Sequence, residues 1–296
     1  MPLPRIGITA GDPAGIGPEI ARKAMADGRV TAACEPLFYG SQHPFAPGVL
    51  SADAGLAAYE TIVRAVRDAE SGGIDAIATA PINKEALALA GLPWRGHTEM
   101  LAELTHASSV AMMFWSEKLR VVLATIHIPL ASVPAALTIE SVSRIIELTN
   151  RELPRFGIAR PRLALAGLNP HAGEHGILGR EETDVLEPAV AQSAQAGIDI
   201  SGPFPGDTIF LRAMRGEFDA VIACYHDQGL IPIKMAAFGQ AVNVTLGLPI
   251  IRTSVDHGTA FDIAGKDIAD PESMVQAVLL AAKLATHGPD VGRARF

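Results

Sequence analysis

Short aliphatic segments alternate with longer amphipathic segments along almost the whole chain of 296 residues. The short segments have the length and branched side chains of buried strands, and the longer ones have the apolar spacing of helices. This alternation indicates β–α–β units, which build a parallel or mixed sheet covered by helices. We therefore predict an α/β protein. Strands are expected near residues 5–9, 36–39, 74–79, 110–115, 121–126, 162–166, 220–224 and 241–245, and helices near 18–26, 55–70, 84–90, 98–105, 139–155, 181–196 and 271–285.

The composition and charge exclude several classes of protein. Hydrophobic residues make up 49% of the chain, enough for a large core, and the net charge of −8 argues against a nucleic-acid partner. The two cysteines form no disulfide framework, which fits a reducing compartment. Neither a signal peptide nor an apolar run of membrane-spanning length is visible. We expect a cytoplasmic protein without a membrane partner.

The glycine-rich segment GDPAGIGPEI, residues 11–20, follows a predicted strand and precedes a predicted helix. A dinucleotide-binding loop of the G-x-G-x-x-G type needs a third glycine, and Ile20 occupies that position. A Rossmann phosphate loop is therefore disfavoured. Two interpretations remain: a tight turn that leads into a helix, or a loop that places Asp12 at the edge of a substrate cleft.

Three of the nine histidines follow predicted strands. His127, His171 and His226 stand at the carboxyl ends, where open α/β sheets bind their ligands. Three imidazoles can hold a divalent transition metal and leave positions open for a substrate. Asp227 can orient His226 as a neighbouring carboxylate. The alternative is that each histidine is an ordinary hydrogen-bonded residue of a loop or core.

A second set of polar residues indicates an anion site. His97 and Thr98 begin a predicted helix, whose free N–H groups and dipole favour an anion. Lys234, Asn243 and Arg252 lie in apolar surroundings, where a cation needs a partner. That partner is either a protein carboxylate or a shared anionic ligand. Thr98 can also be a simple helix cap.

The general base of a reaction at these sites is not evident from the sequence. Asp207 lies in a predicted turn, Asp227 follows a candidate metal ligand, and Lys84 begins a predicted helix after a strand and turn. Each of the three is a candidate proton acceptor.

Seven segments together resemble the 4-hydroxythreonine-4-phosphate dehydrogenase family of vitamin B6 biosynthesis, including its paralogs that act on 4-phospho-D-threonate or 4-phospho-D-erythronate. The resemblance covers nearly the whole chain, although between Tyr39 and Gly55 the chain is shorter than is usual in the family. The segment GHTE argues against a more distant branch that acts on aromatic cis-dihydrodiols. The seven matching segments are GDPAGIGPEI, TAPINKEAL, RGHTEML, ATIHIPL, GLNPHAGE, ACYHDQGLIPIK and NVTLGLPIIRTSVDHGTAFDIAG.

The resemblance implies a fold and an assembly. The fold is similar to that of isocitrate and isopropylmalate dehydrogenases, with two α/β/α domains and a cleft between them. We expect a first domain of residues 1–96 and 253–296 and a second domain of residues 97–252. The family is usually homodimeric, so we expect a homodimer.

The resemblance also implies roles for individual residues. His127, His171 and His226 match positions that bind a divalent metal at a site shared between two subunits. Positions matching His97, Thr98, Lys234, Asn243 and Arg252 contact the substrate and its phosphate. Residues 256–266 resemble the nucleotide-binding loop of the isopropylmalate enzymes, in which His257, Gly258, Thr259 and Asp262 are the expected contacts. This loop explains a NAD enzyme without a Rossmann fingerprint.

The activity implied by the resemblance is NAD-dependent oxidation of 4-phosphohydroxy-L-threonine, with decarboxylation, to 3-amino-2-oxopropyl phosphate. Zinc is the preferred metal, with magnesium or cobalt as alternatives. NAD is preferred to NADP because the loop contains a single cation, Lys266. The alternatives are a paralog for the other two phospho-acids, a non-catalytic protein that binds metal or phospho-acid, and an acyl or phosphate transferase.

Overall fold

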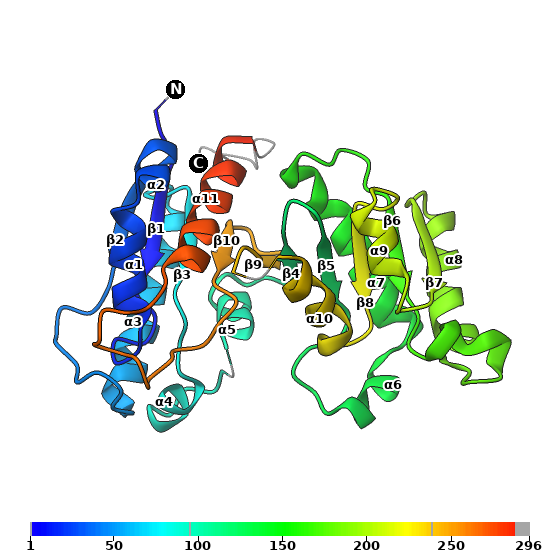
Figure 1. The fold of residues 1–296 in the computed structure, drawn as a ribbon, viewed down its shortest axis with the longest axis horizontal. Coiled ribbons are helices and arrows are strands. Elements are labelled where there is room, and N and C mark those ends of the chain that lie inside the picture. Colours follow the sequence, from blue (N-terminus) through cyan, green and yellow to red (C-terminus); the bar gives the residue numbers. More distant parts are fainter. Residues whose placement is uncertain (1, 95, 238, 288–296) are drawn as a thin grey trace. The chain divides into compact units, whose positions relative to one another are not determined.

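The computed structural model describes residues 2–94, 96–237 and 239–287. The chain forms two compact units, and it passes through the first unit twice (Figure 1). The first unit comprises Met1–Val110 and Gly239–His287, and the second comprises Ala111–Phe238. The crossings therefore follow residues 110 and 238, whereas the sequence suggested crossings after 96 and 252. Residues 288–296, which were expected in the first domain, lie outside the described residues.

The sheet of the first unit has five strands, of which four are parallel. Their order is β2, β1, β3, β10, β9, and only β9 runs antiparallel to its neighbour β10. The strands are β1 (Arg5–Thr9), β2 (Glu35–Tyr39), β3 (Ala76–Thr79), β9 (Val242–Leu246) and β10 (Arg252–Ser254). The pairing of β10 with β3 anchors the returning chain in this unit.

Helices cover both faces of this sheet and form two separate cores. Successive residues of β3 show the division, since Ala76 and Ala78 belong to the core under α1 and α11, whereas Ile77 belongs to the core under α3 and α5. This alternation is what the two-residue period of a strand requires. The helices are α1 (Gly17–Met25), α2 (Gly28–Ala33), α3 (Ala52–Glu70), α4 (Lys84–Leu89), α5 (His97–Leu104) and α11 (Glu272–His287).

The second unit is built around a row of five further strands, also of mixed direction. Its order is β4, β5, β8, β6, β7, in which β4 and β5 are antiparallel and the other neighbours are parallel. Four of these strands are almost fully buried, as their aliphatic sequences require. The strands are β4 (Ala111–Trp115), β5 (Arg120–Leu123), β6 (Leu163–Ala166), β7 (Ile200–Phe204) and β8 (Ala220–Ala223).

The helices of the second unit pack on this sheet, with α8 against β7 and α10 against β5 and β8. They are α6 (Val133–Ala136), α7 (Ile139–Glu152), α8 (Glu187–Gln195), α9 (Ile209–Met214) and α10 (His226–Ala236). Four short helical turns complete the unit. They are the 3₁₀ turns η1 (Leu130–Ser132) and η2 (Leu153–Phe156), the irregular turn η3 (Pro170–Gly176) and the π-helical turn η4 (Glu182–Leu186). None of the helices in the described residues is long and apolar enough to cross a membrane.

The predicted α/β class is confirmed, and each of the eight predicted strands corresponds to an observed one. Two strands, β7 and β10, and four helices, α2, α6, α9 and α10, were not predicted from the sequence. β10 has only three residues, and α10 contains Gly229 and Pro232, which disfavour a helix interior. Both missed elements, β10 and α10, contain candidate site residues.

The core between the first sheet and α5 generates a stability prediction. Leu101 is fully buried there, whereas Leu89 of α4 is 56% exposed. Leu101→Ala should lower the free energy of unfolding by roughly 2–5 kcal/mol, because it leaves a cavity. Leu89→Ala, the matched control, should change it by less than about 0.5 kcal/mol. Urea denaturation followed by circular dichroism measures both. Equal effects of the two substitutions would contradict this packing.

Candidate active site

A row of polar side chains crosses the sheet of the first unit near the carboxyl ends of its parallel strands. Thr9 is in register with Thr79, and Thr79 with Ser254. Asn243 of β9 continues the row opposite Ser254. Residues paired across strands point to the same face, so these four side chains share one face of the sheet. Ligands of open α/β sheets bind at this edge, which makes the row a candidate binding surface.

Arg252 lies on the same face and is only 2% exposed. Its Nε and Nη2 donate to Thr79 Oγ1 at 3.2 and 2.8 Å, and its Nη1 donates to Thr245 Oγ1 at 2.9 Å. Within the described residues, no carboxylate forms an ion pair with this guanidinium. Burial lowers the pKa of Arg252 to about 9, so the side chain remains positive at neutral pH. A buried cation without a counter-ion is unfavourable, and the surroundings of Arg252 are therefore suited to an anion.

His97 and Thr98 form the first turn of α5, which packs over this face of the sheet. The N-cap residue Gly96 provides no side chain to the free N–H groups, which leaves them available to a ligand. Burial, and next the positive charge of Arg252, lower the pKa of His97 well below 6.5. The imidazole is therefore neutral at neutral pH and can donate or accept a hydrogen bond beside the guanidinium.

Four buried polar atoms in this unit find no hydrogen-bond partner within the part of the chain that the structure describes. They are Thr9 Oγ1, Asp12 Oδ2, His97 Nε2 and Asn243 Oδ1. Burial raises the pKa of Asp12, although the N–H of Ala14 donates to its other oxygen at 2.8 Å. Each unsatisfied group costs roughly 1–3 kcal/mol, a cost that a polar ligand can relieve.

The glycine-rich segment after β1 packs against the expected nucleotide-binding loop. The N–H of Ile16 donates to the carbonyl of Thr259 at 3.0 Å. A Cβ atom at Gly15 would approach the backbone of Thr259 to 2.9 Å, so glycine permits this close approach. In the loop itself, His257, Gly258 and Asp262 are exposed and Thr259 is half-buried. The glycine-rich segment after β1 is thus a turn into α1, and it supports the expected nucleotide-binding loop.

In the second unit the structure brings together two of the three candidate metal ligands. The ring centroids of His127 and His226 lie 5.7 Å apart. Two imidazoles can span that separation with one ion about 2 Å from each nitrogen. Asp227 Oδ1 lies 2.7 Å from Nδ1 of His226, which leaves Nε2 of that ring as the metal-binding nitrogen. The donor chemistry of this pair fits a divalent cation.

His171 lies in the turn η3 and lines a cavity of about 880 Å³ together with Asp207 and Asp227. Apolar side chains such as Phe210 and Met235 form another part of the wall. No three potential ligands gather into one metal-binding cluster among the described residues of a single chain. The predicted set of three histidines is therefore seen as a pair and a separate member.

The remaining candidates lie at helix ends and turns. Lys84 is the exposed first residue of α4, where the side chain of Asn83 caps the helix. Lys234 is half-buried in the last turn of α10, in the second unit, whereas Asn243 and Arg252 belong to the first. A common contact of these three residues with one ligand stays a prediction.

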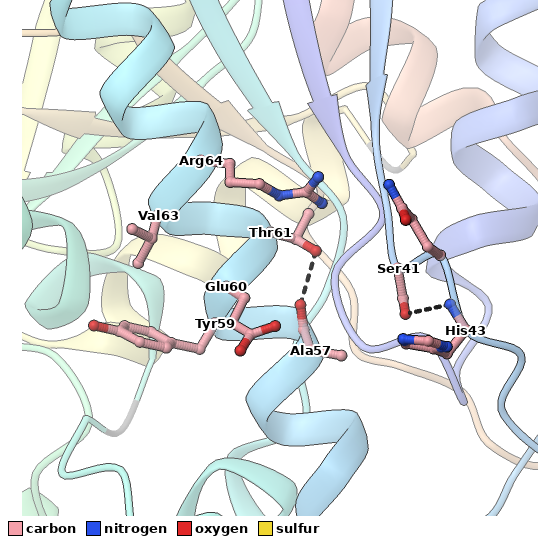
Figure 2. Close-up of a pocket in the computed structure, with 9 residues that line it drawn as sticks. Ser41, His43, Ala57, Tyr59, Glu60, Thr61, Val63 and Arg64 are labelled. Atoms are coloured by element: carbon pink, nitrogen blue, oxygen red, sulfur yellow. Dashed lines mark hydrogen bonds between the residues drawn. The ribbon is translucent and has the colours of Figure 1, made fainter.

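A separate pocket of about 440 Å³ lies between the loop after β2 and helix α3 (Figure 2). Arg64 and Glu60 of the helix and Ser41 and His43 of the loop line it. None of the candidate site residues is among its lining residues. The candidate site is therefore defined by buried polar chemistry rather than by this hollow.

Three residues that the structure places in supporting roles were not predicted from the sequence. Thr79 and Thr245 hold the guanidinium of Arg252, and Glu182 holds the loop that contains His171. The strand register that brings the threonines to Arg252 has no signal in the local sequence. Glu182 is a buried carboxylate in a helical segment whose charged residues otherwise suggest a solvent-facing surface.

Comparisons with known proteins show the family to which the chain belongs. A family model described as "Pyridoxal phosphate biosynthetic protein PdxA" matches residues 19–281. A 4-hydroxythreonine-4-phosphate dehydrogenase from Desulforapulum autotrophicum is 46% identical over 326 residues, covering 96% of both chains. A D-threonate 4-phosphate dehydrogenase from Cupriavidus necator is 45% identical, covering 96% of this chain and 98% of the relative. The aligned lengths exceed 296 residues, so these relatives contain segments without a counterpart here.

Solved structures support the fold. A 4-hydroxythreonine-4-phosphate dehydrogenase from Klebsiella pneumoniae matches with a TM-score of 0.87 and 41% identity, over 96% of this chain and 98% of that one. An isocitrate dehydrogenase from Methylococcus capsulatus matches with a TM-score of 0.52 and 19% identity, over 94% of this chain and 84% of that one. The second match concerns the fold alone, and it confirms the predicted similarity to isocitrate dehydrogenases.

The burial of His97 predicts a pH dependence of stability. Because its pKa is lowered well below 6.5, the unfolded chain binds a proton below pH 6.5 that the folded chain does not. Stability should therefore fall as the pH decreases through 6.5, by up to about 1.4 kcal/mol per pH unit for this one group. Urea midpoints at pH 7.5 and 5.5 should differ less in His97→Gln than in the wild type. The exposed-residue control His43→Gln should behave like the wild type, and an unchanged pH dependence in His97→Gln would contradict the argument.

Proposed function

This chain belongs to the PdxA family of pyridoxal phosphate biosynthetic proteins, and we propose that it oxidises the secondary alcohol of a small phosphorylated hydroxy acid, with NAD as the hydride acceptor. Its relatives are named dehydrogenases, which disfavours the binding-protein and transferase alternatives. The single observation that carries the proposal is the buried guanidinium of Arg252, whose hydrogen-bond partners among the described residues are hydroxyl groups.

The phosphate is proposed to bind at Arg252, together with Asn243, His97 and Thr98 of the same unit. The resemblance to the family also makes Lys234 a proposed substrate contact. Charge-assisted hydrogen bonds contribute roughly 1.5–3 kcal/mol each, so a few of them select a phosphate strongly. The neutral imidazole of His97 supplies a hydrogen bond without adding a second buried charge.

The substrate is proposed to be 4-phosphohydroxy-L-threonine. Oxidation moves a hydride from the hydroxyl-bearing carbon to NAD and a proton from the hydroxyl to a protein base, which leaves a β-keto acid. Loss of CO₂ and uptake of a proton then give 3-amino-2-oxopropyl phosphate. The similar identities of relatives named for 4-hydroxythreonine 4-phosphate and for D-threonate 4-phosphate support the second substrate class almost as well.

The imidazoles of His127, His226 and His171 are proposed to hold a divalent metal, preferably zinc, with magnesium and cobalt as alternatives. When bound, such a cation supplies Lewis acidity at the reacting hydroxyl. The pairing of His127 with His226 and the separate position of His171 support a site completed by a second subunit. We therefore include a homodimer in the proposal.

Asp207 is the favoured proton acceptor of the three candidates. It lines the cavity beside His171 and is exposed to solvent, into which a proton can pass. Asp227 is already engaged with the imidazole of His226, and Lys84 is an exposed helix-end residue. The nucleotide is proposed to bind at His257, Gly258, Thr259 and Asp262. The exposed Lys266 is the single cation of this loop, which supports NAD over NADP.

Turnover assays test the proposed reaction and its metal. The zinc-loaded protein should form NADH with 4-phosphohydroxy-L-threonine, and the same assay should be run with 4-phospho-D-threonate and 4-phospho-D-erythronate. Activity with only the latter two would show that one of them is the substrate, and activity with none of the three would overturn the proposed class of substrate.

His171→Ala should lower kcat/KM by at least about 100-fold, since it removes a metal ligand. His175→Ala, in the same left-handed turn, is the matched control and should retain activity.

Substitution of Arg252 tests phosphate binding separately from the stability of the fold. Arg252→Met replaces a buried, uncompensated cation by an apolar side chain of similar length, so the ligand-free protein should be as stable as the wild type or more stable. Inorganic phosphate should raise the Tm of the wild type and leave that of Arg252→Met unchanged. The control Arg120→Met changes a half-buried arginine and should retain the phosphate effect. A phosphate-induced shift that survives Arg252→Met would place the anion elsewhere.

A further inference from the structure

The turn that contains His171 has an unusual backbone conformation. Five consecutive residues, His171 to His175, adopt left-handed φ and ψ angles, with φ between 44° and 78°. Four of them are not glycine, and each such residue is less stable in this conformation than in a right-handed one. Interactions with the rest of the unit must therefore hold the turn in place.

Glu182 binds the segment that leads into this turn. It is the first residue of η4 and is 1% exposed. Its Oε1 accepts the backbone N–H groups of Leu168 at 2.8 Å and of Asn169 at 2.7 Å, and its Oε2 accepts Nδ2 of Asn169 at 2.9 Å. No cation forms an ion pair with this carboxylate in the described part of the chain. Its charge is thus directed to the loop that leads into His171.

The turn is shaped around this carboxylate. A Cβ atom at Gly173 would lie 2.6 Å from Oε2 of Glu182, and one at Gly167 would lie 3.3 Å from Oε1. Both glycines therefore permit the chain to approach the carboxylate on either side of His171. A carboxamide in its place would have to turn an N–H toward at least one of the N–H groups that the carboxylate accepts.

A second hydrogen-bonded link connects this loop to the chain around His226. The Oε1 of Gln228 accepts the N–H of Cys224 at 2.7 Å, and its Nε2 donates to the carbonyl of Gly167 at 2.6 Å. The ends of β6 and β8 are thereby joined side by side. Glu182 anchors the loop immediately after Gly167, so the position of the His171 turn on the sheet depends on Glu182.

We infer that Glu182 is a positioning residue for metal binding, whose carboxylate holds the left-handed turn in the conformation that presents His171 to a divalent cation. The inference rests on the proposed function, because it takes His171 as a metal ligand. Asn169 and His171 line the 880 Å³ cavity, whereas Glu182 is not among the lining residues. It acts through the loop and contacts neither the metal nor the substrate.

Isothermal titration of the metal-free full-length protein with Zn²⁺ tests the inference. Glu182→Gln should weaken Zn²⁺ binding about 10–100-fold, the usual effect of removing a group that orients a ligand. At saturating Zn²⁺, kcat should return to within a few-fold of the wild type, because no reacting group has been removed. When Co²⁺ replaces Zn²⁺, the visible absorption spectrum of Glu182→Gln should differ from that of the wild type. A loss of stability alone would not change this spectrum. Asp184→Asn, an exposed carboxylate of the same turn paired with Arg180, is the matched control and should bind Zn²⁺ like the wild type.

The outcomes distinguish this inference from the proposed function. If the wild type binds no divalent metal, the proposed metal site fails and the inference fails with it. If His171→Ala loses Zn²⁺ binding but Glu182→Gln retains wild-type affinity, only the inference is overturned. If Glu182→Gln does not fold, Asn169→Ala keeps the carboxylate and removes one of its donors, and it should weaken Zn²⁺ binding by a smaller factor. An unchanged affinity in Asn169→Ala would then overturn the inference.

Discussion

The buried guanidinium of Arg252 is the constraint on which the candidate site of the first unit depends. Three of its nitrogens donate hydrogen bonds, but the acceptors are the hydroxyls of Thr79 and Thr245. Hydroxyl groups satisfy the geometry of the donors and leave the charge uncompensated. The buried charge of Arg252 therefore has an electrostatic cost that a bound phosphate would relieve. Functional sites often have this property, since the residues that bind a ligand are not those that best stabilise the free protein.

The second unit handles a buried charge in the opposite way. Glu182 is as deeply buried as Arg252, yet its oxygens accept three N–H groups from its own unit. Its charge is used to stabilise a turn of unfavourable backbone conformation rather than left available for a ligand. The two buried charges thus have different functions. One defines where an anion can bind, and the other defines where an imidazole is presented.

The elements that were not predicted from the sequence show where local residue patterns fail to predict secondary structure. Helix α10 begins at His226 and contains Gly229 and Pro232, residues that ordinarily indicate a loop. A Cβ atom at Gly229 would lie 2.7 Å from side-chain atoms of Leu123 and Val121, so the glycine permits the helix to pack closely on β5. The expected strand before His127 was also too long, since β5 ends at Leu123. In α10, packing against a neighbouring strand outweighs local propensity.

The sequence by itself determined the α/β class, because the two-residue and 3.6-residue periods of apolar residues are local properties of the chain. Its motifs also identified the family and predicted the residues of the candidate site, including His97, Asn243, Arg252 and the three histidines. Only the tertiary structure decided which of these side chains meet. The partners of Arg252 come from β3 and β9, and Thr79 lies 173 positions away in the sequence. The absence of a carboxylate near that guanidinium, in the residues that the structure describes, follows from the strand register. The register is a property of two strands together, and the paired strands β3 and β10 are far apart in the sequence, so no local pattern can specify it.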